Sequence, residues 1–134
     1  MSGPRTRPSD VDVDAFVAAV PNDRRRADAR SLLALLREVT GEEPRMWGPT
    51  MVGFGSYPVT TSSGTNDWFW LGFSPRSTAL TIYGLTDGED PDPRLAELGP
   101  HTLGRSCLYV KKLDAVDAGL LRTLAAESWA RRPH

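Results

Sequence analysis

The middle third of the chain constrains the fold most, because it combines large aromatic side chains with frequent glycines. Residues 47–57 and 67–75 contain most of the Trp, Phe and Tyr side chains, and Gly or Pro stands at nearly every expected bend. Aromatic side chains bury large areas in a sheet, whereas Gly and Pro determine where its strands turn. These two stretches therefore predict a set of short, tightly connected strands, and neither stretch contains a catalytic or cofactor-binding signature.

Length and composition indicate one globular domain. The 134 residues are 40% hydrophobic and 25% charged, which is ordinary globular usage. A formal charge of -1 argues against a protein that mainly neutralises nucleic-acid phosphates. The single Cys107 cannot form an intramolecular disulfide, and no apolar run is long enough to span a bilayer. We therefore expect a cytoplasmic protein with no nucleic-acid or membrane partner, organised as a flexible leader over 1–8 and a single domain over 9–134.

Apolar residues at helical spacing predict two helices before the strand region. Ser9 is the expected N-cap of the first helix, with Asp12 in the capping-box position, and Pro21 stops this helix. Asn22 is the expected cap of the second helix, which ends at Gly41. The two apolar stripes consist of Val13, Phe16, Val17 and Val20, and of Ala29, Leu32, Leu33, Leu36 and Val39.

From residue 50 onward the apolar period shortens toward two, which is typical of strands. A tight turn at 75–77 predicts an antiparallel hairpin between its neighbouring strands, and a polar loop is expected at 62–66. A short helical segment is expected at 93–98, and a final helix follows Leu113 with Asp114 as its cap. The predicted strands are 50–54, 57–61, 67–74, 78–84 and 106–111. The fold class is therefore α+β, with a mostly antiparallel sheet of about five strands packed by two N-terminal helices and one C-terminal helix.

Alternation along these strands sorts their side chains into two faces. The set expected against the helices is Phe69, Leu71, Phe73, Leu80, Ile82, Leu108 and Val110. The opposite set is Trp68, Trp70, Thr81, Tyr83, Cys107 and Tyr109. Rings that carry a polar atom suit a small-ligand surface, and the same rings suit a second, minor core under loops. Both interpretations assume that no bulge exchanges the two sets.

Three phrases of the sequence resemble the YdhG-like family, also called domain of unknown function 1801. They lie at 47–57, at 67–76 and at 98–109, and the similarity runs from the first helix to the last. The resemblance implies a compact α+β domain with about five mostly antiparallel strands and helices packed on them. Some relatives are described as frataxin-like, with a suggested role in iron handling for iron-sulfur cluster assembly. The family has no catalytic motif to carry across, and this chain has Pro100 where relatives usually have a lysine or similar residue.

Other candidate sites each have a plain structural alternative. Arg24, Arg25 and Arg26 form a solvated face or a phosphate-binding patch. Cys107 is a packing residue or half of a thiolate pair with His101, which is itself a surface histidine or a ligand contact. Acidic clusters at Asp10, Asp12 and Asp14 and at Asp87, Glu89, Asp90 and Asp92 are solvated caps and loops or oxygen ligands for iron.

The sequence favours a non-enzymatic cytoplasmic binding module for a small ligand or a partner protein. The alternative is a frataxin-like accessory protein that handles iron. An enzyme would need a polar cleft that pairs His101 or Cys107 with a carboxylate. No catalytic residue, metal ligand or cofactor is expected, and the oligomeric state is left open. The expected ligand-binding residues are Trp68, Trp70, Tyr83, Tyr109, His101 and Arg105.

Overall fold

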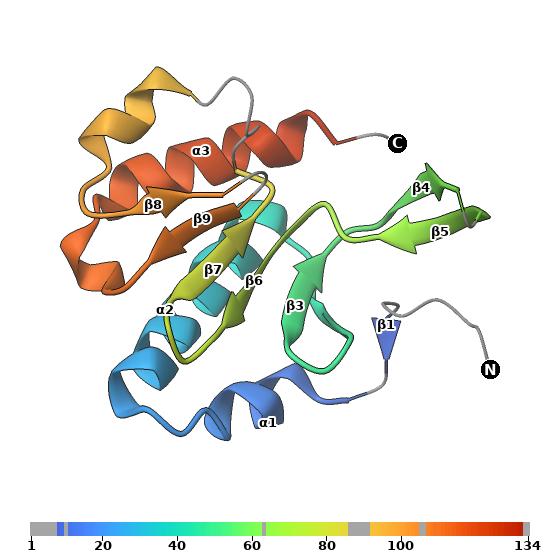
Figure 1. Cartoon of the computed structure of the whole chain (residues 1–134), viewed down its shortest axis with the longest axis horizontal. Coiled ribbons are helices and arrows are strands. Elements are labelled where there is room, and N and C mark those ends of the chain that lie inside the picture. The colour runs from blue at the N-terminus through green and yellow to red at the C-terminus, as the bar shows by residue number, and fades with distance from the viewer. Residues whose placement is uncertain (1–7, 10, 63, 86–91, 105–106, 133–134) are drawn as a thin grey trace.

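The computed structural model describes residues 8–9, 11–62, 64–85, 92–104 and 107–132, and shows an α+β fold in which helices pack on an antiparallel sheet (Figure 1). All strand pairs in the described residues are antiparallel, and the seven-stranded sheet has the order β1-β2-β3-β6-β7-β9-β8. Its strands are β1 (Pro8–Ser9), β2 (Arg45–Trp47), β3 (Met51–Phe54), β6 (Leu71–Pro75), β7 (Leu80–Tyr83), β8 (Thr102–Leu103) and β9 (Cys107–Val110). The predicted fold class is therefore confirmed, although short strands at both edges enlarge the sheet beyond five.

A separate hairpin of β4 (Tyr57–Thr61) and β5 (Gly64–Trp68) extends from the sheet at the end far from β8 and β9 (Figure 1). The expected polar loop at 62–66 is wrong for its second half, because Gly64 already begins β5. In the hairpin, the Thr60 hydroxyl of β4 and the Thr65 hydroxyl of β5 lie 3.0 Å apart. Cross-strand hydroxyl pairs of this kind stabilise a strand pair, although Gly, Asn and Asp in β5 have weak strand propensity.

Two N-terminal helices, α1 (Val13–Ala18) and α2 (Asp23–Thr40), precede the sheet. The expected cap at Ser9 is wrong, since Ser9 pairs with Met46 in the sheet and the Asp12 carboxylate caps α1 by accepting from the Asp14 amide. Pro8, the last residue of the expected leader, likewise pairs with Trp47, and residues 1–7 lie outside the described residues. The caps of α2 are as predicted: Asn22 accepts from the Arg25 amide, and Gly41 ends the helix at φ +66°.

The C-terminal part contains two short 3-10 segments, η1 (Pro93–Glu97) and η2 (Leu113–Ala115), and the helix α3 (Ala118–Ala130). The expected cap at Asp114 is wrong, because this residue lies inside η2 and the Asp117 carboxylate caps α3 by accepting from the Leu120 amide. Both aspartates precede an apolar run, so local sequence permits either start. The bond from the Asp117 amide to the Leu98 carbonyl, at 2.7 Å, selects the later one.

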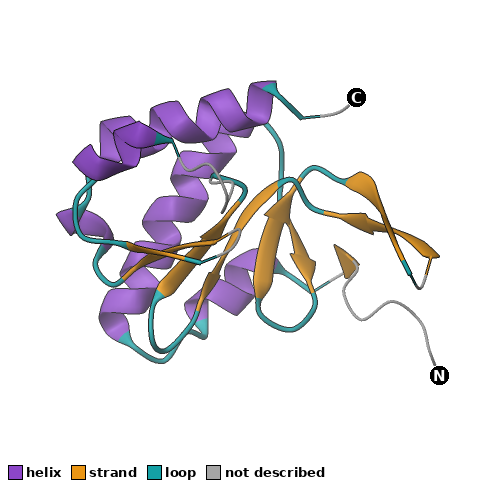
Figure 2. Cartoon of the chain, turned by 45° about the horizontal axis from the view of Figure 1, so that its top comes forward, coloured by secondary structure: helices purple, strands orange, loops and turns teal. Residues whose placement is uncertain are grey.

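The helices lie together on one side of the sheet (Figure 2). Eight apolar side chains on that side of the central strands are completely buried, and they form one core with the apolar stripes of α1, α2 and α3. This side, termed the helix-covered face, consists of Val52, Phe54, Leu71, Phe73, Leu80, Ile82, Leu108 and Val110. Its composition confirms the predicted inward set, with the exception of Phe69.

Candidate functional site

The opposite side of the sheet, termed the reverse face, is ordered by the strand register. One row across four strands consists of Gly53, Gly72, Tyr83 and Cys107. The next row consists of Ser74, Thr81, Tyr109 and Thr102. The first row is flat at its glycine end, and the second carries hydroxyl groups throughout. The reverse face therefore has space for a ring beside its two glycines, and it has polar groups along the whole second row.

Phe69 fills the glycine end of the reverse face. A Cβ at Gly53 would stand 2.5 Å from Phe69 Cβ, and a Cβ at Gly72 would stand 2.8 Å from its ring, so both positions require glycine for this close approach. Trp68 stacks on Phe69 with ring centroids 4.6 Å apart, and Trp47 and Tyr83 meet it edge-on. Trp47 and Phe69 are fully buried but stand apart from the main core. Trp47, Trp68, Phe69 and Tyr83 form what we term the aromatic cluster, a minor core on the reverse face.

The sequence assigned Phe69 and Trp70 to the wrong faces. The expected continuous strand over 67–74 is interrupted, because β5 ends at Trp68 and β6 begins only at Leu71. The irregular junction exchanges its two rings, so Phe69 lies on the reverse face and Trp70 packs against the main core. The Trp70 indole N–H donates to the Ser128 carbonyl of α3 at 2.7 Å. Trp70 is therefore removed from the candidate ligand surface.

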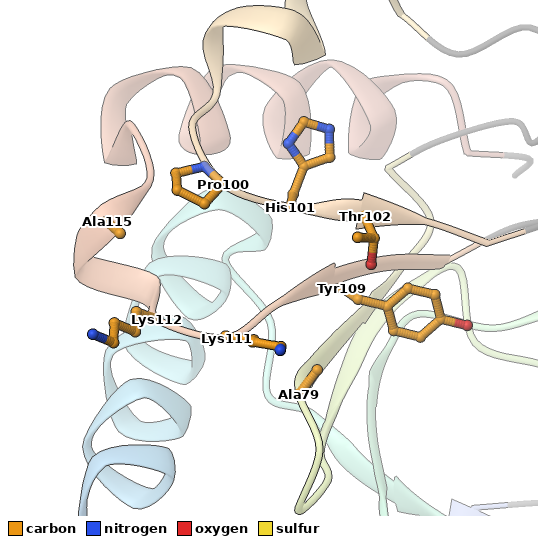
Figure 3. Close-up of a pocket in the computed structure, with 8 residues that line it drawn as sticks. All are labelled: Ala79, Pro100, His101, Thr102, Tyr109, Lys111, Lys112 and Ala115. Atoms are coloured by element: carbon orange, nitrogen blue, oxygen red, sulfur yellow. The ribbon is translucent and has the colours of Figure 1, made fainter.

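At the other end of the reverse face lies a hollow of about 360 Å³, shown in Figure 3. Its polar lining residues come from β8, β9 and the segments that flank them: His101, Thr102, Tyr109, Lys111 and Lys112. Its apolar lining residues are Ala79, Pro100 and Ala115. We term this the lysine hollow, and none of its lining residues in the described chain is acidic.

The walls of the lysine hollow are held by contacts outside it. The Arg25 guanidinium, from α2, donates to the Lys111 carbonyl at 3.2 Å, and the Asp28 carboxylate accepts from the Leu113 amide at 3.0 Å. Gly99 adopts φ +116°, and a Cβ there would stand 2.7 Å from the Ala115 carbonyl oxygen. Only glycine permits this turn to pack on η2. The backbone around both lysines is thus anchored, whereas their side chains are exposed.

Lys111 and Lys112 are the only lysines in the sequence, which otherwise uses arginine as its cation. Neither lysine forms an ion pair with a residue that the structure describes, whereas Arg24, Arg26, Arg37, Arg94 and Arg122 all do. In Figure 3 the two side chains leave the backbone in different directions, with Lys112 beside Ala115 and Lys111 between Lys112 and Tyr109. The hollow therefore has positive charge that no described carboxylate neutralises.

His101 and Tyr109 present different groups at the hollow. The His101 Nδ1 lies 2.7 Å from the Gly99 carbonyl oxygen, so Nδ1 donates this bond. Tyr109 is half-buried, and its hydroxyl lies against Gly104, where a Cβ would stand 2.8 Å from the oxygen. The charge of Cys107 and a hydrogen bond with it raise the pKa of Tyr109 above the ordinary value of 10.0. The phenol is therefore neutral at pH 7 and contributes mainly its ring to the hollow.

Cys107 of β9 pairs with Tyr83, a member of the aromatic cluster on β7. Burial raises the pKa of Tyr83 above 10.0, with a smaller contribution from the charge of Cys107. Cys107 is a half-buried free thiol, so the expectation of a packing residue is closer to the structure than a thiolate pair with His101. His101 makes its described hydrogen bond to a backbone carbonyl, and no described bond links it to Cys107.

The expected ligand-binding residues are therefore only partly brought together. His101 and Tyr109 share the lysine hollow, Tyr83 and Trp68 belong to the aromatic cluster, and Arg105 lies outside the described residues. Sequence reasoning missed Lys111 and Lys112 as site residues, together with the lining residues Ala79, Pro100, Thr102 and Ala115. The available signal was the position of the chain's two lysines, side by side at the end of a strand.

The other candidate sites have structural explanations where they are described. Arg24 pairs with Asp114, Arg25 donates to backbone carbonyls, and Arg26 donates to the Val20 carbonyl and pairs with Asp23, so each of the three arginines has a partner within the protein. Asp14 pairs with Arg37. In the described ranges, no three His, Cys, Asp or Glu side chains are grouped as a metal site would require. Asp10, Asp87, Glu89 and Asp90 lie outside those ranges.

None of the described helices combines the length and the hydrophobicity that crossing a membrane requires. Comparison of the chain with protein-family models, with curated proteins and with solved structures gives no match. The resemblance to the YdhG-like family therefore stays a prediction, and a function for this chain has to be inferred from its fold and its lysine hollow.

Proposed function

We propose that this protein is a non-enzymatic binding module that holds a small anionic molecule in the lysine hollow. The observation that carries the proposal is the placement of both lysines of the chain, without described acidic partners, around one hollow. A volume of about 360 Å³ suits a small organic molecule. An anion in this position would supply the countercharge that the described residues do not.

The choice of lysine in an arginine-rich chain supports this assignment. The arginines of the helices make fixed structural contacts, such as the forked contact of Arg94 with Asp92 and Glu127. Lysine is a compact point charge on a flexible stem, so it adapts to an incoming anion more readily than it fixes a fold. Two exposed ammonium groups attract an anion and leave the backbone undisturbed.

The proposal is limited to binding because the described groups at the hollow form no catalytic pair. A nucleophile needs a base within hydrogen-bond reach. His101 is the candidate base, and its described partner is the Gly99 carbonyl. Frataxin-like iron handling stays an untested prediction, since its supporting acidic residues Asp87, Glu89 and Asp90 are outside the described residues.

Chemical-shift mapping by NMR tests the proposal. Acetate, benzoate and inorganic phosphate are titrated separately into the isotope-labelled protein, and at least one is expected to shift the amide signals of Thr102 and Ala115 in a saturable manner. The double substitution Lys111→Ala and Lys112→Ala should abolish those shifts. Arg30→Ala is the matched control, because Arg30 is an exposed cation on α2 away from the hollow. Absence of saturable shifts with all three anions would reject the proposed site.

A further inference from the structure

We propose that the ligand of the lysine hollow is an organic monoanion, a carboxylate on a flat apolar body. This inference rests on the proposed function and names its ligand class. It is supported by three properties of the hollow: the chemistry of its walls, the direction of its lysines and the absence of arginine from its described lining.

The walls favour an apolar body. Ala79, Pro100 and Ala115 contribute only carbon atoms from their side chains, and Tyr109 adds a ring whose hydroxyl is directed to Gly104. An inorganic ion is much smaller than a hollow of about 360 Å³, and it would leave these carbon surfaces in water. An aromatic or alicyclic group would cover them, at a gain of about 25 cal/mol for each Å² of apolar surface removed from water.

The lysines favour a single negative charge. Lys111 and Lys112 are consecutive, and their side chains diverge from the backbone in Figure 3. In this arrangement the two ammonium groups lie apart, so binding one doubly charged phosphate would require both flexible side chains to reorient. One of them can instead pair with a carboxylate at the rim of the hollow, while the other contributes long-range attraction that falls off within a Debye length.

The polar groups of the described lining are not those of a typical phosphate site. Phosphate is commonly held by bidentate arginine or by several backbone N–H groups at the start of a long helix. No described lining residue is arginine, although the sequence contains many, and the adjacent η2 has only three residues. The Thr102 hydroxyl, which extends from β8 toward β9 in Figure 3, is a neutral donor suited to the second carboxylate oxygen.

A matched set of probes tests this ligand class. Benzoate, benzyl alcohol and inorganic phosphate are titrated into the full chain by NMR, so that ring and charge are removed one at a time. Benzoate is expected to have a dissociation constant at least tenfold lower than that of either other probe. Lys111→Ala or Lys112→Ala should weaken benzoate at least threefold with little change for benzyl alcohol, and Arg30→Ala should change neither.

The outcomes separate this inference from the proposed function. Phosphate that binds as tightly as benzoate would overturn the apolar body while leaving an anion site in place. Benzyl alcohol that binds as tightly as benzoate would overturn the need for charge. If no probe shifts the signals of Thr102 and Ala115, the proposed function fails as well. Melting curves of each variant verify that the exposed substitutions leave the fold intact.

Discussion

The two faces of the sheet differ in the kinds of side chain that they carry. The eight side chains that define the helix-covered face are all apolar and completely buried. The reverse face has glycines, hydroxyl groups and aromatic rings, and it lacks a helical layer (Figure 2). Three amphipathic helices cover the first face, whereas no described helix of comparable length lies on the reverse face.

This difference shows how the chain protects part of a sheet without another layer. At the β3–β6 end, Gly53 and Gly72 make room for Phe69, and Trp47 and Trp68 pack around it. At the β8–β9 end the described residues supply the single phenol ring of Tyr109, which lines the lysine hollow and does not fill it. The candidate binding site thus lies where the aromatic cover ends.

The largest expected effect on stability comes from removing a buried ring from the helix-covered face. Phe73→Ala should lower the free energy of unfolding by about 3–5 kcal/mol, because it removes a completely buried ring and leaves a cavity. Urea denaturation monitored by circular dichroism measures the change. A loss below about 1 kcal/mol would indicate that Phe73 does not close the main core, since exposed sites typically lose less than that.

A smaller loss is expected from filling a glycine site on the reverse face. The Cβ of Gly72→Ala would stand 2.3 Å from the Val52 carbonyl oxygen and 2.8 Å from Phe69. Overpacking of this kind costs about 1–3 kcal/mol. Gly119→Ala in α3 is the matched control, because the nearest atom to its Cβ, an oxygen of the Asp117 cap, is 3.3 Å away and alanine favours helix. Equal effects of the two substitutions in urea denaturation would contradict a closely packed aromatic cluster.

A pH-dependent effect is expected where α3 is tied to η1, away from both faces. Pairing with Arg94 lowers the pKa of Asp92 from 3.8 to about 2 and lowers that of Glu127. A lowered carboxyl pKa stabilises the folded state above the unfolded value, and this contribution is lost as pH falls from about 4 toward 2. Arg94→Gln should therefore destabilise the protein at pH 6 and lose its effect near pH 2. A difference in melting temperature that is independent of pH would refute the ion-pair explanation.

The smallest effect on stability is expected in the lysine hollow itself. Lys111→Ala and Lys112→Ala should each change the free energy of unfolding by no more than about 0.5 kcal/mol, because both side chains are exposed and neither has a described ion pair. Urea denaturation of these variants, set beside their loss of benzoate binding, sharpens the contrast between a structural and a functional surface. A loss comparable with that of Gly72→Ala would show that the lysines support the fold.

Local sequence patterns predicted most elements of the fold correctly. Asn22 and Gly41 bound α2 as expected, and the turn at 75–77 joins β6 and β7 in the predicted hairpin. The errors at Ser9 and Asp114 share one cause. Several polar residues near a helix start can serve as its cap, and the choice depends on pairing with distant segments, here Met46 and Leu98.

The candidate site was harder to predict than the fold. The sequence pointed to an aromatic reverse face and correctly placed Trp68, Tyr83 and Tyr109 there. The predicted faces of Phe69 and Trp70 were wrong, because alternation with a period of two does not reveal the irregular two-residue junction between β5 and β6. It also passed over Lys111 and Lys112, since exposed lysines are usually part of a solvated surface.

The amino-acid sequence by itself determined the α+β class, the apolar stripes of the helices and the inward set of most strands, because each depends on periodicity within a few residues. Only the tertiary structure decided that Phe69 closes one end of the reverse face and that β8, β9, η2 and the segments beside them enclose the lysine hollow. Those features require contacts between segments that are distant in sequence. Because Gly53, Gly72 and Gly99 have no Cβ, distant segments can pack closely against their backbone. No local pattern specifies which segment does so.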